Sequence, residues 1–179
     1  METTKTINFR TVEIKGERIL LSPVTSKYRN HIFNEFTIEI TRFMFPASPS
    51  ELSEVDSFIE LSKEGMDNKT DLVLVITDIE NGEFLGVCGL HGSKLPQEPE
   101  LGIWLKKSAH SKYLGREAIK YLVKWVKENV VYDYLVYPAD KENIPSRKIA
   151  ESLGGEIFRE AARENMSGNI LNEVAYKII

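Results

Sequence analysis

The 179-residue sequence has few of the residues that build disulfides, metal sites or membrane spans. Cys88 is the only cysteine, which excludes an intramolecular disulfide and a metal site with several cysteine ligands. The three histidines, His31, His91 and His110, do not have the spacing of metal ligands, so we expect no metal site. No apolar run approaches the roughly 20 residues that cross a bilayer.

Residues 1–10 also lack the apolar stretch of a secretory signal. We therefore expect a cytoplasmic protein that does not enter a membrane. Hydrophobic residues make up 42% of the chain and charged residues 28%, which is ordinary for a soluble globular protein. The length suits one domain with a sizeable core. We interpret residues 1–16 as a polar lead-in and residues 17–179 as that single domain.

The sequence has no excess of positive charge of the kind that favours nucleic-acid binding. It contains 27 acidic and 23 basic residues, and its formal net charge is −4. Four basic residues are nevertheless close together in the sequence: Lys106, Lys107, Lys112 and Arg116. A local basic patch in an acidic chain indicates a small anionic ligand and not nucleic acid.

The first part of the sequence predicts two short strands and two helices. The strands are expected around residues 10–14 and at 18–22. A serine or threonine caps the first helix, which is expected over 25–36, and the second helix is expected over 50–65. Gly65 suits a C-cap, because helices often end on a glycine.

The middle of the sequence changes to the pattern of strands. Residues 71–78 and 84–90 are rich in β-branched and other apolar residues, and the pair Asn81-Gly82 between them indicates a hairpin with a connection longer than two residues. A third strand is expected at 101–105. Apolar residues at helical spacing then predict a helix over 115–130.

The last part of the sequence predicts a short strand at 134–137 and a helix over 144–153, which the glycines after it stop. Two further strands are expected near 156–159 and over 171–178. Strands in a meander, a helical crossover and further strands indicate an α+β fold with one mixed sheet.

The connection between the third strand and its helix is the most informative segment. A strand, a basic loop and a helix in this order direct free backbone N–H groups and the positive end of a helix dipole at a ligand in the loop, which favours a phosphate or pyrophosphate. The loop is Ser111–Arg116. A dinucleotide-binding loop would need the pattern G-x-G-x-x-G, and Gly115 is the only glycine in this window.

Three separated segments of the sequence resemble the GNAT superfamily of N-acetyltransferases, and within it the RimJ/RimL-like branch. Glu100-Leu-Gly-Ile-Trp-Leu105 is similar to the "E-x-G-x-W-L" central strand of that branch. His110-Ser-Lys-Tyr-Leu-Gly-Arg-Glu-Ala118 stands where the family has Q/R-x-x-G-x-G/A and a helix. Asn143-Ile-Pro-Ser-Arg147, with Leu153-Gly154, is similar to the later helix with "N-x-x-S" and "L-G-F".

The resemblance implies an acyl-CoA N-acyltransferase fold, with a single mixed, mostly antiparallel central sheet between helices. It also implies transfer of an acetyl group from the cosubstrate acetyl-CoA to a primary amine, either a protein N-terminus or a small molecule. The residues that would bind the cofactor are Trp104 and Leu105, through their backbone, Asn143, and the loop residues Ser111, Lys112, Tyr113, Leu114, Gly115 and Arg116. No metal is implied, and the sequence leaves room for a homodimer.

The catalytic residues that we predict are Glu100 and Ser146. The Glu100 carboxylate is the candidate general base, because an amine must lose a proton when it attacks a thioester. It is equally compatible with a solvated charge at the end of a strand. Ser146 would orient a water or the departing thiol, and Tyr137 is a rival proton donor. Asn143 is also compatible with an ordinary N-cap. Phe43, Met44 and Phe45 suit a wall of the acceptor pocket or the core.

Three residues depart from the family pattern. His110 stands where Gln or Arg is usual, Tyr113 replaces the first motif glycine, and Gly155 stands where an aromatic residue is usual. Because only glycine adopts positive φ freely, we expect the loop to keep a negative φ at Tyr113 or to shift. The alternatives to a transferase are a non-catalytic module that binds acyl-CoA or a partner, and a nucleotide-binding α/β protein.

Overall fold

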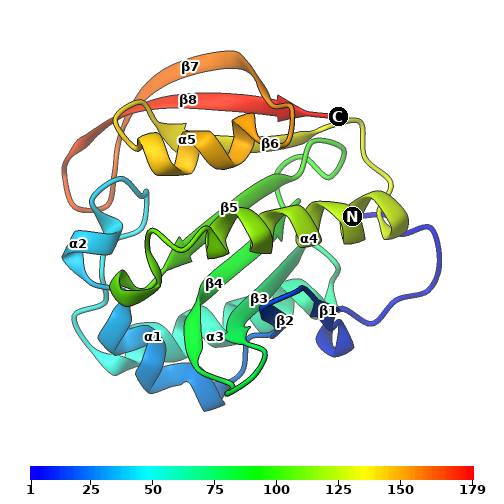
Figure 1. Cartoon of the computed structure of the whole chain (residues 1–179), viewed down its shortest axis with the longest axis horizontal. Helices are drawn as coiled ribbons and strands as arrows, with labels where there is room; N and C mark the ends of the chain where they lie inside the picture. The colour runs from blue at the N-terminus through cyan, green and yellow to red at the C-terminus, as the bar shows by residue number, and fades with distance from the viewer.

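The computed structural model describes all residues from 1 to 179 and shows one eight-stranded sheet with the order β1-β2-β3-β4-β5-β6-β8-β7 (Figure 1). All neighbouring strands are antiparallel except β5 and β6, so the predicted mixed, mostly antiparallel sheet is confirmed. The strands are β1 (Ile14–Lys15), β2 (Ile19–Pro23), β3 (Asp71–Asp78), β4 (Phe84–His91), β5 (Glu100–Leu105), β6 (Leu135–Asp140), β7 (Glu156–Glu164) and β8 (Ile170–Ile178).

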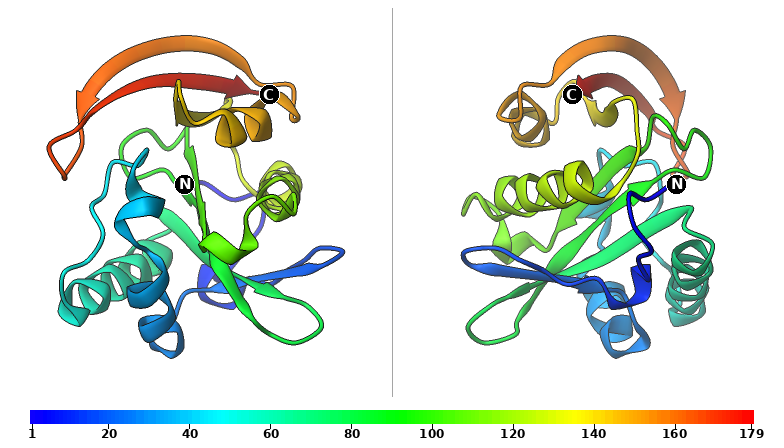
Figure 2. Two further views of the ribbon diagram at one scale, coloured as in Figure 1. Left: turned by 60° about the vertical axis from the view of Figure 1, so that its left-hand side comes forward. Right: turned by 90° about the vertical axis from the view of Figure 1, so that its right-hand side faces the viewer.

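Helices cover both faces of the sheet. The helices α1, α2 and α3 lie on one side of the first five strands, and α4 lies on the other (Figure 2). The helices are α1 (Arg29–Glu35), α2 (Ile38–Thr41), α3 (Leu52–Asp67), α4 (Leu114–Asn129) and α5 (Ile144–Glu151), and three short 3-10 turns lie at Phe9–Thr11, Ser26–Tyr28 and Lys107–Ala109. No helix is both long enough and apolar enough to span a bilayer.

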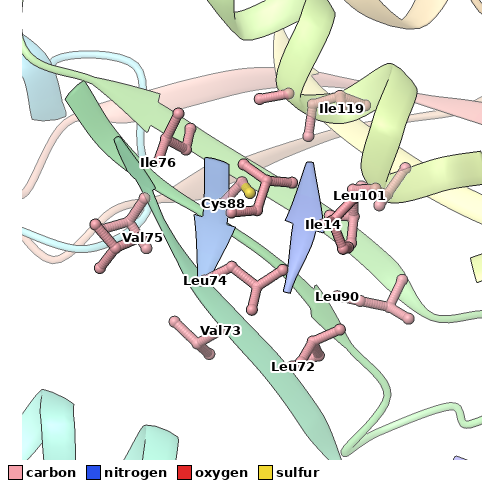
Figure 3. Close-up of a cluster of buried hydrophobic side chains, with 14 of the residues drawn as sticks. Ile14, Leu72, Val73, Leu74, Val75, Ile76, Cys88, Leu90, Leu101 and Ile119 are labelled. Atoms are coloured by element: carbon pink, nitrogen blue, oxygen red, sulfur yellow. The ribbon is translucent and has the colours of Figure 1, made fainter. Parts of the chain in front are cut away.

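The core explains why β3 and β4 are nearly continuous apolar runs. Side chains alternate between the two faces of a strand, and here helices cover both faces. Figure 3 shows Leu74 of β3 on the side of Ile119 from α4, whereas Val75 points the other way. Cys88 of β4 is buried on the α4 side, and burial raises the pKa of its thiol to about 12. The interpretation of Cys88 as a buried apolar residue is confirmed.

The strands β5 and β6 pair only at their first residues. Glu100 is the register partner of Val136, and the Val136 N–H donates to the Pro99 carbonyl at 3.0 Å. Beyond this point the two strands diverge. Because backbone groups alternate along a strand, the nitrogen of Pro138, like that of Val136, faces the β5 side. Proline has no N–H to donate, but β5 has already diverged at this point, so β6 can contain a proline there without losing a hydrogen bond.

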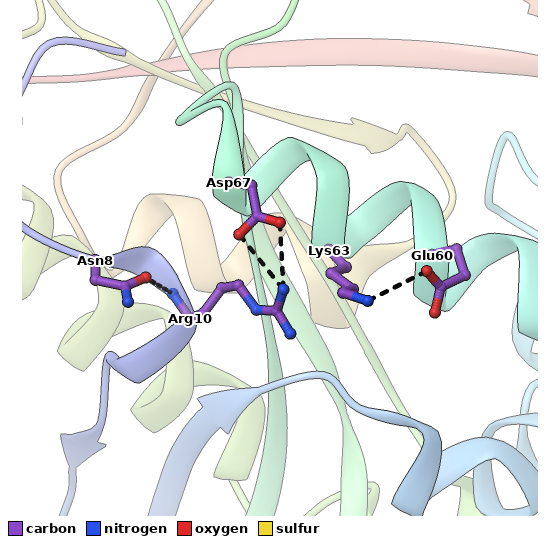
Figure 4. A network of polar contacts seen from close by, with 5 residues as sticks. All are labelled: Asn8, Arg10, Glu60, Lys63 and Asp67. Carbon is purple, nitrogen blue, oxygen red and sulfur yellow. Dashed lines mark hydrogen bonds and ion pairs between the residues drawn. The ribbon is translucent and has the colours of Figure 1, made fainter.

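The N-terminal lead-in packs onto the domain. The side chains of Phe9, Val12 and Ile14 are buried in the main core. Arg10 forms an ion pair of 3.2 Å with Asp67 at the end of α3, and this contact lies near a further ion pair within that helix (Figure 4). The lead-in is therefore a structural part of the domain.

Some element boundaries differ from the sequence-based expectation. The helix α3 continues through Gly65 to Asp67, so the prediction of Gly65 as a C-cap was wrong. Gly65 instead stands against Asp71, where an added β-carbon would come within 3.0 Å of the carboxylate. The strand β6 extends past the proline to Asp140, and the short helix α2 was not predicted.

Candidate active site

A cleft of about 240 Å³ lies where β5 and β6 diverge. It is lined by residues 100–103 of β5, 137–140 of β6, Asn143 and Ser146 of the α5 region, and loop residues 43–46. Side chains His91, Arg163, Leu171 and Glu173 complete the lining. The structure thus brings together the predicted residues Glu100, Asn143 and Ser146, and it places Phe43, Met44 and Phe45 in the wall of the same cleft.

Beyond the point where β6 diverges, the backbone groups of Ile103 and Leu105 lie on the unpaired edge of β5. The Trp104 carbonyl points toward β4, where it would lie 2.1 Å from a β-carbon added to Gly86. Backbone groups alternate along a strand, so those of Ile103 and Leu105 face the side that β6 has left. Of the two predicted backbone ligands, Leu105 therefore has its backbone groups on the open edge, whereas those of Trp104 face β4. The Trp104 ring packs against Phe36, with 4.7 Å between ring centroids.

The loop after β5 adopts the left-handed conformation at two residues. Ser111 and Tyr113 both have a φ of 61°, so the first of the two alternatives for Tyr113, a negative φ, is wrong. The Tyr113 side chain is 72% exposed, and the Arg116 guanidinium lies 5.6 Å from the centre of its ring. The ring therefore projects into solvent and does not fill the loop. His110 closes the loop, because its Nε2 contacts the Leu105 carbonyl at 2.9 Å.

The N-terminus of α4 presents backbone donors at this loop. The first N–H bonded within the helix is that of Glu117, which donates to the Tyr113 carbonyl at 3.1 Å. The N–H groups of the three residues before it, Leu114, Gly115 and Arg116, have no acceptor inside the helix, which is typical of a helix start. Such groups, together with the helix dipole, favour an anion at this position.

Gly115 allows close packing at the same helix end. An added β-carbon would come within 3.2 Å of Ile149 of α5 and within 3.4 Å of Leu105 of β5. The glycine therefore lets α4 approach both elements, and its φ is not positive. This position serves helix packing, whereas the positive φ of the motif falls on Tyr113.

Of the four basic residues in this region, two are already paired with carboxylates. Lys106 is buried and forms an ion pair with Glu83, and Lys107 forms one with Glu39. Lys112 and Arg116 have no acidic partner within ion-pair distance. The prediction of four basic residues at one anion site therefore reduces to two.

Glu117 anchors the first turn of α4 to the β1–β2 turn. Its carboxylate is buried and accepts from the backbone N–H groups of Glu17 and Arg18 at 3.0 and 2.8 Å. The Arg18 guanidinium adds an ion pair of 2.7 Å. The acidic side chain thus points away from the loop, and its charge is compensated where it lies.

The start of α5 forms the other wall. Asn143 caps the helix, because its Oδ1 accepts from the Ser146 N–H at 3.3 Å. The Ser146 hydroxyl lies 3.0 Å from the Tyr137 hydroxyl. Burial raises the pKa of Tyr137 to about 12, although the contact with Ser146 opposes the rise. Tyr137 is therefore protonated at neutral pH and can donate to Ser146.

Two residues that the sequence did not single out, Arg163 and Glu173, also line the cleft. Arg163 of β7 forms an ion pair of 2.9 Å with Glu173 of β8, and its guanidinium lies 4.6 Å from the centre of the Phe45 ring. Burial, followed by the charges of nearby carboxylates, raises the pKa of Glu173, although Arg163 lowers it. The short prediction for β7 ended before Arg163, so no sequence signal placed it here.

An open strand edge beside a helix N-terminus can hold a ligand that has both amide groups and phosphates. The strand edge offers sheet-like hydrogen bonds to an amide-containing arm, and the helix end offers donors to a pyrophosphate. Coenzyme A has both parts. Together with the α+β sheet, this site defines a transferase that uses acyl-coenzyme A.

The comparison with protein families agrees. A family model described as "Acetyltransferase (GNAT) domain" matches residues 18–156, so the chain belongs to this family and is an acetyltransferase that uses acetyl-CoA. A search of curated proteins gave no match.

Solved structures share the fold at low sequence identity. The Microcin C7 self-immunity acetyltransferase MccE, in complex with acetyl-CoA and AMP, has a TM-score of 0.79 and 22% identity over 91% of this chain and 93% of its own. A Bacillus anthracis GNAT-family acetyltransferase has a TM-score of 0.77 and 15% identity over 94% and 98%. A Vibrio cholerae protein assigned as a ribosomal-protein-serine acetyltransferase has a TM-score of 0.75 and 14% identity over 95% and 98%.

Proposed function

We propose that the enzyme transfers the acetyl group to a primary amine by direct attack, without a covalent acyl-enzyme. The observation that carries this proposal is the position of Glu100. Its side chain lines the cleft at the point where β5 and β6 part, between the open edge of β5 and loop residues 43–46. A carboxylate at this place meets an amine that approaches the thioester from the loop side.

The donor would be held by backbone and side-chain groups. The Ile103 and Leu105 backbone would bond the pantetheine arm, and the Asn143 amide nitrogen, which the cap leaves unused, would bond one of its carbonyls. The pyrophosphate would lie on the N–H groups of the Ser111–Arg116 loop, with Lys112 and Arg116 adding charge. These roles agree with the open strand edge and the helix start described above.

In the reaction the amine nitrogen attacks the thioester carbonyl, and the Ile103 N–H, on the open edge of β5 and in the lining of the cleft, stabilises the developing oxyanion. Glu100 takes the proton of the amine, directly or through one water. The C–S bond then breaks, and the thiolate takes its proton from solvent through a water that the Ser146 hydroxyl orients. Tyr137 holds the Ser146 hydroxyl through the hydrogen bond between them and keeps its own proton. Holding both reactants in place contributes up to about 7–11 kcal/mol to such reactions.

The acceptor class is supported by the lining of the cleft. Three carboxylates, Glu100, Asp140 and Glu173, line it against one guanidinium, that of Arg163. A negative lining attracts an ammonium group. The RimJ/RimL resemblance and the likeness to the Vibrio cholerae protein favour a protein N-terminus as the acceptor. A small-molecule amine is the second candidate acceptor.

Release of the coenzyme A thiol on three amines tests the proposal: a peptide with a free N-terminal serine, spermidine and free amino acids. Replacing Glu100 with glutamine keeps the shape of the side chain but removes the base. We expect Glu100→Gln to lower kcat by about 10²–10⁴-fold and to leave the KM for acetyl-CoA unchanged.

Glu98→Gln is the matched control, because Glu98 lies two residues earlier and does not line the cleft. An unchanged rate and pH profile in Glu100→Gln would remove Glu100 from the mechanism. Thiol release on none of the three amines would contradict the amine acceptor itself.

A further inference from the structure

A second carboxylate and an imidazole form a row with Glu100 across three neighbouring strands. Asp71 of β3 is the register partner of His91 of β4, and His91 is the register partner of Glu100 of β5. Opposed residues of antiparallel strands project from the same face of a sheet. The three side chains therefore lie next to one another, and both His91 and Glu100 line the cleft.

Three glycines leave room for this row. The His91 ring lies over Gly89 and Gly102, where added β-carbons would come within 2.9 and 3.4 Å of its Nε2. Gly65 of α3 stands against Asp71, where a β-carbon would lie 3.0 Å from Oδ2. A β-carbon at Gly89 would press on the ring and one at Gly65 on the carboxylate, whereas one at Gly102 would only reach van der Waals contact with the ring. The packing thus holds the imidazole against the sheet, with Nε2 over Gly89 of β4 and Gly102 of β5.

The contact with Asp71 determines which ring nitrogen carries the proton. His91 Nδ1 lies 3.0 Å from Asp71 Oδ1. Burial raises the pKa of Asp71, but hydrogen bonds from His91 and Thr70 outweigh this effect and hold the pKa below its usual value. Asp71 is therefore ionised and only accepts. In the neutral ring Nδ1 then donates, and Nε2 keeps its lone pair on the side of the cleft.

We infer that His91, held by Asp71, is a second proton acceptor of this active site, which takes the proton of the amine from Glu100 and releases it to solvent. This inference rests on the proposed function. The proton on the Glu100 carboxyl moves to Nε2, directly or through one water, and the carboxylate is restored. The imidazolium then gives the same proton to bulk water. The His91 side chain is 42% exposed, so solvent reaches it, whereas the Asp71 side chain is 19% exposed.

Imidazole chemistry suits this role. A neutral imidazole accepts a proton on one nitrogen while the other keeps its hydrogen bond, and the imidazolium can give that proton up again. Asp71 acts through His91 and is a positioning residue. The charged groups around the ring, which any pH profile will also report, are Asp71, Glu100, Arg163 and Glu173, with the N-terminal ammonium group of the chain near Asp71.

The ring tautomer gives a test that needs no acceptor. Nitrogen–proton NMR correlations of the imidazole rings distinguish the two nitrogens, and His91→Gln assigns the His91 signals. We expect the proton of the neutral ring on Nδ1 in the wild type, and a shift toward Nε2 in Asp71→Asn, in which the amide can donate to Nδ1. A proton on Nε2 in the wild type would overturn the inference.

Kinetics test the role in turnover. We expect His91→Gln to lower kcat by about 10–100-fold with an unchanged KM for acetyl-CoA, and to give a pH profile of kcat that differs from that of the wild type. Imidazole in the buffer should restore activity to His91→Gly, which a purely structural role would not explain. His31→Gln, in α1, is the control.

The outcomes separate this inference from the proposed function. If the wild type acetylates the serine peptide, spermidine or an amino acid and His91→Gln keeps both kcat and its pH profile, the inference is wrong and the proposed function stands. If the wild type acetylates none of them, the proposed function is wrong, and the tautomer measurement still decides whether Asp71 prepares His91 as an acceptor.

Discussion

At the scale of single residues, the partners of a basic side chain decide whether it can serve the ligand. Lys106 and Lys107 are in ion pairs with Glu83 and Glu39, and Lys107 is the largest cause that holds the pKa of Glu39 below its usual value. Lys112 and Arg116 have no such partner. Lys106 and Lys107 are close in the sequence to Lys112 and Arg116, but only Lys112 and Arg116 have a charge that no carboxylate neutralises and that can attract a phosphate.

This difference leads to a prediction for coenzyme A binding. We expect Lys112→Ala and Arg116→Ala each to raise the Kd for coenzyme A by about two- to fivefold at low salt, because each removes one exposed charge. The effect should shrink as salt is added. Lys107→Ala is the matched control, and isothermal titration calorimetry measures all three. Equal losses in Lys107→Ala would show that the pair with Glu39 opens on binding.

The residue scale also shows what the sequence could determine at the site. Short motifs singled out Glu100 and Ser146, and the fold places both in the cleft. Strand alternation separates the backbone of Ile103 from that of Trp104, a distinction that the motif alone does not make. In the sequence His91 is one of three isolated histidines, and no pattern shows that β4 extends to it and brings it opposite Glu100.

At the scale of elements, the start of α4 depends on a contact far away in the sequence. Glu117 fastens the first turn of this helix to the β1–β2 turn through two backbone N–H groups and Arg18. The donors that would bind phosphate lie in the same turn. The position of the loop therefore depends on a side chain that does not itself contact the ligand.

We expect Glu117→Ala to lower the free energy of unfolding by about 1–3 kcal/mol, because it removes the acceptor of two partly buried backbone N–H groups and the partner of Arg18. Arg18→Ala should cost less than about 1 kcal/mol, since its side chain is half exposed. Urea unfolding measures both. A similar loss in the two variants would show that the ion pair, and not the backbone contact, carries the stabilisation.

The elements differ in how well the sequence predicted them. The hairpin of β3 and β4 was predicted almost to the residue, because its apolar runs and the Asn81-Gly82 turn agree. The strand β6 was predicted too short, since Pro138 is unfavourable inside a sheet. The sequence does not show that β5 has diverged from β6 on the side that the nitrogen of Pro138 faces, so that no hydrogen bond is lost there. Gly65 was misread because its neighbour Asp71 comes from another element.

At the scale of the whole molecule, the core contains two acids that stay neutral. Burial raises the pKa of Cys88 to about 12 and that of Tyr137 to about 12. In the unfolded chain a thiol titrates near pH 8.5 and a phenol near pH 10. Above these values the unfolded state loses protons that the folded state keeps, so stability falls as the pH rises.

We therefore expect the free energy of unfolding to be steady up to about pH 8 and to fall by about 3.5 kcal/mol by about pH 10.5, mostly from Cys88. Urea unfolding at several pH values measures the slope. Cys88→Ala has a lower baseline, because it leaves a small cavity, but should show a shallower fall. An equal slope in this variant would assign the pH dependence to other groups.

The divergence of β5 from β6 also has a mechanical consequence. The sheet consists of two portions, β1–β5 and β6–β8–β7, which share a single pair of register partners. A cosubstrate arm bound along the gap would form hydrogen bonds with the main chain on both sides, and so connect the two portions as an additional strand would. When the product thiol leaves, these bonds are lost, so the relative motion of the two portions is coupled to each catalytic cycle.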